Sequence, residues 1–567
     1  MISSLPLWYN RRQENQLERT MKQNCKRIFS LLLCAALVCT LFAGCGGRNK
    51  QLDIIYPITG NITSFDPQVA ATQDEYLIAE NCYEGLVRVE DDGTVKPAVA
   101  VDWTVSTDQK TYTFHLRQGL KWHLTDAVTE RMGKNWDPDI TAHDFVFALQ
   151  RAVSPQTACP LYPALSGIAG AQQVYTKQKS ASALQVKATD DYTLVITLRT
   201  PDAGFFSTLS GAAAMPCNKE FFTATKGRYG LGTEYSLFNG QFYVKNQLDT
   251  SYTLNKNQEY KGTNPTKVDN ITLNIKDENS KVPEKLESGY YDAAFLTGSE
   301  YGALKKKDDL TAIPYANTTW AFLLNTNQGS LSNEKMRRAI CLSLSPADTK
   351  NSKYLQASTG ITPPSTTVDG GNVTTAKNSL VPARDAARAQ TLWKAGLEET
   401  GLTTVALTVI TTPEMDAYAK ALVQGVQSSL GTVTTYGNGT GIAFSLKIET
   451  MTKAEMESQM AAGTYDIALY PMEAASQSPV TFLSNLLSTN YMKLQSDKIE
   501  RALTVAKNAT AGTATAACRA CEQALIQTGA VLPVFYESAY YVMAGGVSGV
   551  QFHPGSGRVS FVEAVRA

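Results

Sequence analysis

Residues 405–471 alternate between strand-like and helix-like patterns. In chain order the stretch contains VALTVI (405–410), PEMDAYAKALVQGVQSSL (413–430), IAFSLKIET (442–450), TKAEMESQMAAG (452–463) and YDIALYP (465–471). The short runs predict strands, whereas the two longer runs have the apolar spacing of amphipathic helices. Strands that alternate with helices pack as a sheet with helices on its faces. This stretch therefore predicts a three-layer α/β region.

The N-terminal half mixes the same patterns in a different order. TYTFHLR (111–117) alternates apolar and polar residues, as a half-buried strand does, and VKATDDYTLVITLR (186–199) predicts a hairpin. Thr141 and Asp144 have the spacing of a capping box at the start of a helix. The fold class predicted for the whole chain is α/β with mixed sheets.

The composition argues against some classes of function. A chain of 567 residues is long enough for two or three domains. Its 52 basic and 52 acidic residues balance, which argues against a nucleic-acid partner. Only four histidines occur, which disfavours a histidine-built metal site, and we expect no cofactor.

The start of the chain has the layout of an export signal. Residues 28–43 (IFSLLLCAALVCTLFA) carry no charge, follow basic residues and are shorter than the roughly 20 apolar residues of a membrane span. The segment FAGC (42–45) resembles a bacterial lipobox. We therefore expect a lipid on Cys45 that anchors the protein to the outer side of the bacterial membrane. An ordinary secreted protein is the alternative.

This interpretation assigns residues 1–44 to the signal and 45–52 to a lipidated linker. Residues 1–20 do not suit a signal, and Met21 is a plausible true start. Cleavage removes six basic and two acidic residues, so the mature chain carries about four net negative charges.

Six cysteines remain after this cleavage: Cys82, Cys159, Cys217, Cys341, Cys518 and Cys521. They can pair in an exported protein, so their disulfide state stays open, but they are too few for a disulfide scaffold. Cys518 and Cys521 have the spacing of a redox or zinc motif, yet they share an apolar helical face with Leu525 and Ile526. We expect them to pack as small core residues.

Motifs of known enzymes are mostly absent. The sequence contains no Gly-x-Ser-x-Gly and no His-Glu-x-x-His. Ser332 and Lys335 match Ser-x-x-Lys, as in penicillin-recognising enzymes, but no Lys-Thr-Gly accompanies them. Ser332 precedes a helical pattern, so we expect it to cap that helix. The sequence predicts that the protein is not an enzyme.

Several phrases of the sequence point to one family. They are FDPQ (65–68), NCYEGLVRVEDDGTVKPAVAVDWTVSTDQKTYTFHLRQGLKW (81–122), TAHDFVFALQRAVSP (141–155), MRRAICLSLSPAD (336–348) and VLPVFY (531–536). With these phrases the chain resembles the extracytoplasmic solute-binding proteins of family 5, the oligopeptide- and dipeptide-binding components of ABC importers. The likeness extends over most of residues 53–567.

The resemblance implies a two-lobe fold of the periplasmic-binding-protein type, with an extra subdomain inserted in the first lobe. The expected division is a first lobe of 49–83, 219–317 and 538–567, an inserted subdomain of 84–218 and a second lobe of 318–537. The chain then crosses between the lobes near 317 and 537, and two such crossings make a hinge.

The implied function is that of a monomeric substrate-binding lipoprotein. It would capture a peptide between its lobes and deliver it to the permease subunits of an ABC importer and their ATPases. The alternatives are a binding protein for a non-peptide or amino-blocked solute and a surface receptor without import. A surface hydrolase is the alternative that the sequence supports least. The identity and length of the ligand stay open.

The expected ligand loop departs from the family pattern Gly-Trp-x-Ala-Asp-Tyr-x-x-Pro. In typical peptide binders its Asp pairs with the peptide's α-ammonium, but here that position is Ala475, the Trp is Met472 and the Tyr is Ser476. A buried ammonium needs an anionic partner, and Glu473 is the nearby candidate unless it is simply solvated. The candidate ligand-binding positions are Tyr162, Trp320, Met472, Glu473, Ala475, Ser476, Gln477 and Tyr536.

A second departure from the family lies in the inserted subdomain. HLTDAVTERMGKNWDPDI (123–140) stands where the family has a short Ser-Asp-Gly turn. We expect this longer segment to form a surface loop.

Overall fold

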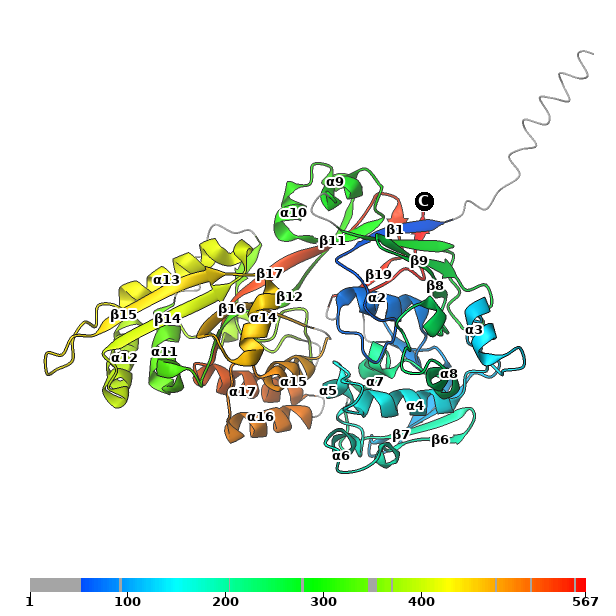
Figure 1. The fold of residues 1–567 in the computed structure, drawn as a ribbon, viewed down its shortest axis with the longest axis horizontal. Coiled ribbons are helices and arrows are strands. Elements are labelled where there is room, and N and C mark those ends of the chain that lie inside the picture. The colour runs from blue at the N-terminus through cyan, green and yellow to red at the C-terminus, as the bar shows by residue number, and fades with distance from the viewer. Residues whose placement is uncertain are drawn as a thin grey trace, which may run out of the picture. The chain divides into compact units, whose positions relative to one another are not determined.

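Three sheets of four or more strands organise the folded part of the chain (Figure 1). The structure is a computed structural model, and it describes residues 52–90, 94–202, 204–276, 280–344, 354–368, 371–474, 477–509, 512–554 and 557–567. Residues 53–567 form one compact unit, separate from residues 1–52. Cys45 and the predicted signal lie outside the described residues. No helix within the described residues is long and apolar enough to cross a membrane.

The first sheet has four strands in the order β1-β10-β9-β8. They are β1 (Asp53–Ile58), β10 (Asn270–Ile275), β9 (Ser251–Lys256) and β8 (Phe242–Leu248). β1 is parallel to β10, and the other neighbours are antiparallel. Ile271 and Leu273 of β10 are buried, because alternate side chains of a strand point to the same face. Helix α2 (Gln73–Cys82) begins at Thr72, whose hydroxyl accepts a hydrogen bond from Glu75 N at 3.2 Å.

The small sheet has four antiparallel strands in the order β4-β5-β7-β6. They are β4 (Ala100–Val105), β5 (Thr111–Leu116), β7 (Thr193–Thr197) and β6 (Val186–Asp190), so the predicted hairpin is confirmed. The sheet is accompanied by α4 (Ala142–Val153), α5 (Tyr162–Leu165), α6 (Ala171–Tyr175) and α7 (Phe205–Leu209). The capping box at Thr141 and Asp144 is also confirmed. Residues 100–213 are called the small-sheet region below.

The segment 123–140 does not form only a loop, as the sequence analysis expected. It contains a helix, α3 (Asp126–Met132). The Thr125 hydroxyl accepts a hydrogen bond from Val128 N at 3.2 Å, and the Val128 side chain is fully buried. Gly133 ends the helix with a positive φ of 87°, a conformation that glycine adopts readily. A local cap, the buried side chains Val128 and Ile140, and a hydrogen bond from the Trp136 indole to Glu220 at 2.8 Å hold the insertion against the rest of the protein.

The large sheet has the strand order β11-β17-β12-β16-β14-β15, and β13 also pairs with β17. These strands are β11 (Ala293–Thr297), β17 (Val531–Met543), β12 (Thr311–Leu324), β16 (Ile467–Glu473), β14 (Thr404–Thr411), β15 (Ala443–Thr450) and β13 (Leu355–Ala357). β14 is parallel to both β15 and β16, whereas β12 and β17 are antiparallel to their neighbours. The strand–helix alternation predicted for 405–471 is confirmed.

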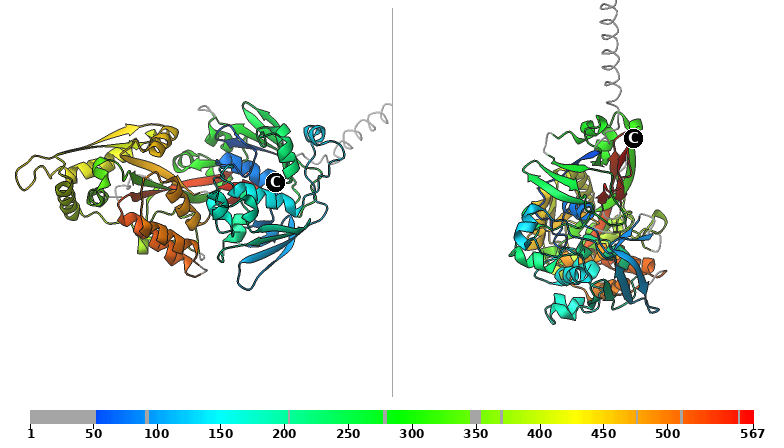
Figure 2. Two further views of the ribbon diagram at one scale, coloured as in Figure 1. Left: turned by 60° about the horizontal axis from the view of Figure 1, so that its bottom comes forward. Right: turned by 90° about the vertical axis from the view of Figure 1, so that its right-hand side faces the viewer.

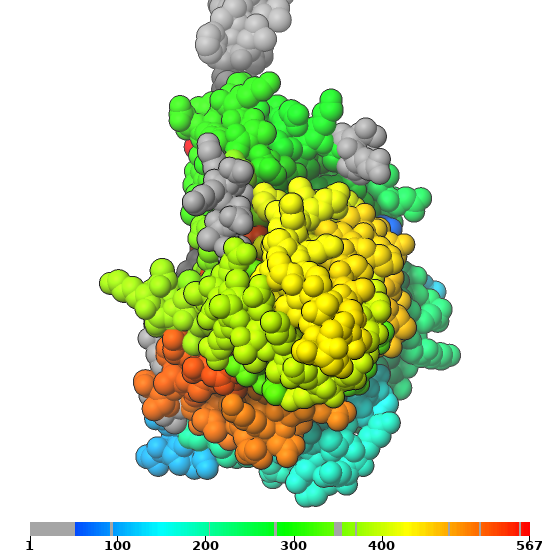
Figure 3. Space-filling view, turned by 90° about the vertical axis from the view of Figure 1, so that its left-hand side faces the viewer, coloured from blue at the N-terminus to red at the C-terminus, as the bar shows by residue number. Residues whose placement is uncertain are grey.

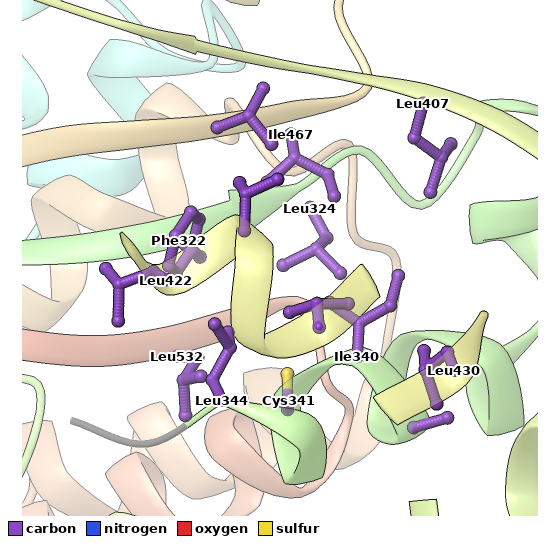
Figure 4. Packing of buried hydrophobic residues seen from close by; sticks show 14 of the residues in the cluster. Phe322, Leu324, Ile340, Cys341, Leu344, Leu407, Leu422, Leu430, Ile467 and Leu532 are labelled. Carbon is purple, nitrogen blue, oxygen red and sulfur yellow. The ribbon is translucent and has the colours of Figure 1, made fainter. Parts of the chain in front are cut away.

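Helices cover the large sheet, and the buried apolar residues of the sheet and these helices form two separate clusters. The helices of the first cluster are α11 (Glu334–Ser343), α12 (Ala386–Thr400) and α13 (Asp416–Leu430). Phe322 and Leu324 of β12 pack there with Ile340 and Leu422 (Figure 4). Figure 3 shows the end of this region, where residues near β15 and α13 form the yellow surface.

The helices of the second cluster are α14 (Lys453–Ala462), α15 (Pro479–Thr489), α16 (Asp497–Lys507) and α17 (Ala514–Gln527). Cys518 and Cys521 of α17 are fully buried in this cluster, so the predicted core packing is confirmed. No disulfide joins the six cysteines of the described residues, and all six side chains are buried.

The start of α11 differs in one detail from the expectation for Ser332. The N-cap is the next residue, Asn333, whose Oδ1 accepts hydrogen bonds from Lys335 N at 2.9 Å and Met336 N at 3.2 Å. The Ser332 hydroxyl instead donates to Gly329 O at 2.8 Å. Ser and Asn are both good caps, so the sequence pattern alone could not separate two adjacent candidates.

The long strands β12 and β17 connect two parts of the unit. The first part of β12 and the last part of β17 pair with each other beside β11, and their other ends pair beside β16. The register between β12 and β17 shifts between Tyr315 and Thr318, and again between Trp320 and Ala321. The regular ladder is therefore interrupted between these two ends.

The remaining elements are short. They are β2 (Val87–Val89), β3 (Val95–Pro97), α8 (Lys219–Ala224), α9 (Val282–Glu287), α10 (Gly298–Ala303), β18 (Val547–Ser548), β19 (Gln551–His553), β20 (Arg558–Ser560) and β21 (Val565–Arg566). β20 packs against α2 and brings Arg558 close to the site described next.

Candidate ligand-binding site

A cavity of about 350 Å³ lies between the small-sheet region and the helices of the second apolar cluster. Helix α5 of the small-sheet region contacts α15, and Figures 1 and 2 show the cyan and orange segments meeting at this boundary. The cavity therefore has walls from segments that are far apart in the sequence.

Three parts of the chain line the cavity. The small-sheet region contributes Leu161, 163–167, Arg199, Thr200, Asp202, Gly204, Ser207, Thr208 and 211–213. The opposite wall consists of Thr367, Val368, 477–481, Ser484, Ala506, Lys507, Ala509 and Ala514. Tyr76, Val89, Glu90, His553 and Arg558 complete the lining. Small and apolar residues with a few charged groups are typical of ligand sites.

Local sequence explains why α15 begins at the cavity. Ser478 is the N-cap, and its hydroxyl accepts a hydrogen bond from Thr481 N at 3.2 Å. Pro479 occupies the first turn, where a helix does not need its missing N–H. All three residues line the cavity. The cap thus fixes the start of the helix at the wall.

A buried carboxylate holds the loop that precedes Thr367. Glu522 of α17 is fully buried and accepts hydrogen bonds from Ile361 N at 2.7 Å and Thr362 Oγ1 at 2.5 Å. Burial raises the pKa of the Glu522 carboxyl to about 7, and these hydrogen bonds oppose the shift. Thr367 N donates to Gln477 O at 2.9 Å. The loop, α17 and the start of α15 therefore form one connected wall.

Two cations and one carboxylate on the lining lack a charged partner among the described side chains. Arg199 follows β7, and Lys507 is the last residue of α16. Burial lowers the pKa of the Lys507 ammonium, and repulsion by Arg199 lowers it further. Asp202 accepts a hydrogen bond from Gly204 N at 2.8 Å, and burial raises the pKa of its carboxyl.

Two other charged residues of the lining have partners in the protein. Arg558 Nη1 lies 3.0 Å from Glu80 Oε2. Glu90 Oε1 lies 3.2 Å from Lys96 Nζ. These charges are already compensated.

The predicted site residues near this cavity are few. Gln477 lines it, and Tyr162 lies on α5 between the lining residues Leu161 and Pro163. The Tyr162 hydroxyl donates to Gln172 Oε1 at 2.9 Å, and the ring stacks on Tyr175 with 3.7 Å between centroids. Tyr162 itself is not part of the lining. The predicted positions Ala475 and Ser476 lie outside the described residues.

The other predicted residues lie on the large sheet, away from the cavity lining. Tyr536 is buried, and its hydroxyl accepts a hydrogen bond from Gly360 N at 2.9 Å. Met472 is buried in the second apolar cluster. Glu473 is exposed, and its carboxylate lies 2.6 Å from Lys453 Nζ.

Glu473 belongs to a pair of carboxylates that we call the acidic row, namely Glu473 and Glu537. Glu473 of β16 and Glu537 of β17 lie on either side of Thr318, because β12 is the strand between β16 and β17. The indole N–H of Trp320 donates to Glu537 Oε2 at 2.8 Å. Burial raises the pKa of the Glu537 carboxyl, the Trp320 hydrogen bond opposes the shift, and Glu473 adds to it. The structure thus places Trp320 and Glu473 near each other but not on the cavity.

Sequence reasoning missed the charged residues of the cavity. Arg199 ends the predicted hairpin and Lys507 ends a helix, and neither belongs to a recognisable motif. Their neighbours Thr200 and Asn508 are 308 positions apart, yet the Thr200 hydroxyl donates to Asn508 Oδ1 at 3.3 Å. No local pattern signals such a contact.

The chain is similar to known proteins over most of its length. Residues 94–493 match the family described as bacterial extracellular solute-binding proteins, family 5 middle. The dipeptide-binding protein of Lactococcus lactis subsp. cremoris (strain MG1363) is 25% identical over 566 residues, 94% of this chain and 98% of that protein. The dipeptide-binding protein DppE of Bacillus subtilis (strain 168) is 25% identical over 504 residues, 87% of this chain and 88% of that protein.

A solved structure shows the same fold. The substrate-binding domain of an oligopeptide ABC transporter from Bacillus anthracis str. Ames matches with a TM-score of 0.73 and 23% sequence identity. The match covers 91% of this chain and 100% of that chain.

Proposed function

Because the chain belongs to the bacterial extracellular solute-binding proteins of family 5, we propose that it captures short peptides outside the cell and delivers them to an ABC importer. The observation that carries this proposal is the cavity of about 350 Å³ between the small-sheet region and the helices of the second apolar cluster. A solute-binding protein needs such a cavity between parts that can close on the solute.

The volume of the cavity favours a small peptide. Ligand pockets typically measure roughly 300–1,000 Å³, so this cavity is near the lower end of the range. Two relatives that align with most of the chain are named dipeptide-binding proteins. A ligand of about two or three residues is therefore favoured over a long peptide.

We also propose the division into lobes that the family resemblance implies. The first lobe is assigned to 49–83, 219–317 and 538–567, with 84–218 inserted, and the second lobe to 318–537. The register of β12 and β17 is irregular between Tyr315 and Thr318, next to the first expected crossing. An interrupted ladder resists bending less than a continuous one, which supports a hinge at this place.

An amino-blocked solute is the second candidate ligand. Ala475 stands where typical peptide binders of the family have Asp, and the Glu473 carboxylate already has Lys453 beside it. An unpaired buried ammonium costs several kcal/mol. We therefore expect free peptides to bind weakly unless the acidic row, which lies outside the cavity lining, can receive their amino group.

The lipid anchor on Cys45 belongs to the same proposal. The charged start, the apolar run and the FAGC segment support it. Cys45→Ser should release the protein from membranes and abolish labelling by a fatty-acid probe. Unchanged membrane attachment and labelling of this variant would contradict the anchor.

A hydrolytic function has little support. The Ser332 hydroxyl donates to a backbone carbonyl, and Lys335 pairs with Glu399. Ser332 therefore has no adjacent base in the described structure, which a serine nucleophile needs. Within the same residues, no group of three His, Cys, Asp or Glu side chains is arranged to hold a metal ion.

Two measurements test the proposed function. Native mass spectrometry of protein purified from its host should detect a co-purified peptide of low mass. Titration calorimetry should then give saturable binding of Ala-Ala or Ala-Ala-Ala, and weaker or no binding of free alanine. Binding of a sugar or metal chelate in place of every peptide would contradict the peptide assignment.

A further inference from the structure

Arg199 and Lys507 bring two positive charges to one cavity from opposite walls. Arg199 belongs to the small-sheet region, and Lys507 ends α16. The adjacent residues Thr200 and Asn508 are hydrogen-bonded at 3.3 Å, so the two segments meet at this point. The two cations therefore converge because of the tertiary packing.

The protein does not neutralise this pair within the residues that the structure describes. Neither Arg199 nor Lys507 has a carboxylate within salt-bridge distance there, whereas Arg558 and Glu90 on the same lining each have a partner of opposite charge. The lowered pKa of Lys507, caused first by burial and then by Arg199, indicates that the repulsion reaches the ammonium group. The cavity lining thus carries two positive charges, one on the exposed Arg199 and one on the partly buried Lys507, that no described carboxylate compensates.

Asp202 is the carboxylate to consider as an internal counter-ion. It lines the same cavity, but it accepts its hydrogen bond from Gly204 N, and burial raises the pKa of its carboxyl. A nearby guanidinium that paired with it would lower this pKa. Asp202 therefore leaves the charge of Arg199 and Lys507 available to a ligand.

We propose that a carboxylate of the ligand binds between Arg199 and Lys507 and joins the two walls of the cavity. This inference rests on the proposed function, because it takes the ligand to be a peptide. Arg and Lys both donate charge-assisted hydrogen bonds to carboxylates. An anion that contacts both cations also removes their repulsion, so the same contact would favour approach of the two walls.

The size of the effect follows from the chemistry of such contacts. Hydrogen bonds to charged groups change affinity by about tenfold to a hundredfold. A ligand that lacks the carboxylate should lose this factor. A protein that lacks either cation should lose most of it for carboxylate ligands and little for neutral ones.

The test compares ligands and variants in one thermodynamic cycle. Ala-Ala and its C-terminal amide are titrated by calorimetry into the wild type, Arg199→Gln and Lys507→Gln. Arg501→Gln is the matched control, because Arg501 is an exposed cation of the same helix that does not line the cavity. Thermal unfolding of each variant checks that it is folded.

We expect amidation to weaken binding to the wild type and to Arg501→Gln by about tenfold to a hundredfold. In Arg199→Gln and Lys507→Gln the difference between the two ligands should shrink to a few-fold. The amide of Ala-Glu distinguishes the source of the carboxylate, because it regains affinity for the wild type only if a side-chain carboxylate can also reach the pair.

Three results would overturn the inference. If the dipeptides bind but amidation has no effect, or if both variants weaken the acid and the amide equally, the carboxylate lies elsewhere, and the proposed function still stands. If neither dipeptide binds the wild type, the proposed function fails and this inference fails with it.

Discussion

The Arg199–Lys507 pair is positively charged and the acidic row is negatively charged. They also differ in whether the protein already provides partners for their charges. Arg199 and Lys507 converge from two regions and have no carboxylate partner among the described residues. Glu473 and Glu537 lie in one sheet, and each has a partner in the protein. A charge without a partner gains more from a ligand than a charge that must first give one up. The carboxylate end of a peptide should therefore contribute more to affinity than its amino end.

Reversal of one cation tests this comparison most severely. Lys507→Glu places a carboxylate opposite Arg199, so an attraction within the protein replaces the attraction for the ligand. We expect the affinity for Ala-Ala to fall by roughly a hundredfold or more, as calorimetry would measure. Arg501→Glu, the same reversal on the exposed side of α16, should leave the affinity within about threefold. An undiminished affinity of Lys507→Glu would refute the assignment of the carboxylate.

A second prediction concerns Glu522, a buried carboxyl in the wall of the cavity, rather than a charge that contacts the ligand. The Glu522 carboxyl has a pKa of about 7 in the folded protein, against 4.5 for an unperturbed Glu. Between these values the folded state holds a proton that the unfolded state has lost, so stability falls as pH rises through this window. The contribution is about 3 kcal/mol, fully present below pH 4.5 and lost above about pH 7.

Urea unfolding at several pH values checks this expectation. Glu522→Gln should flatten the fall in unfolding free energy between pH 4.5 and 7. Glu84 is another buried glutamate whose pKa burial raises to about 7, and it provides the matched variant Glu84→Gln, which should remove a separate part of the slope. A pH profile of Glu522→Gln that is identical to that of the wild type would show that Glu522 titrates normally.

The smallest expected effect concerns the amino end of the ligand. Glu473→Gln should weaken free-amine peptides by at most a few-fold, because Lys453 already competes for that carboxylate. Ala475→Asp should strengthen free-amine peptides by about tenfold and leave N-acetylated ones unimproved. Calorimetry with matched free and acetylated dipeptides decides. A large loss in Glu473→Gln would reverse the comparison between the two ends.

Local patterns predicted local structure well in this protein. The alternation over 405–471 became β14, β15, β16 and the helices between them, and the capping box at Thr141 formed, because periodicity and caps act over a few residues. The helix α3 was missed because its anchor, Val128, is buried by tertiary packing that the segment itself does not reveal.

The candidate site was less predictable for the same reason. Gln477 was named from the resemblance and does line the cavity. Arg199 and Lys507 were not, because a hairpin end and a helix end acquire a common role only when the two regions pack together. Trp320 and Glu473 were predicted as ligand-binding residues, but they lie on the adjacent strands β12 and β16 of the large sheet, outside the cavity lining.

Hydrogen exchange with and without saturating Ala-Ala tests the central claim, that a peptide binds between the two walls of this cavity. The account predicts slower exchange in two segments that are far apart in sequence, α5 with its flanks (161–167) and the start of α15 (479–484). Helix α13, which packs in the other apolar cluster, should serve as the unchanged reference. Protection on only one wall, or none at saturation, would contradict capture of the peptide between them.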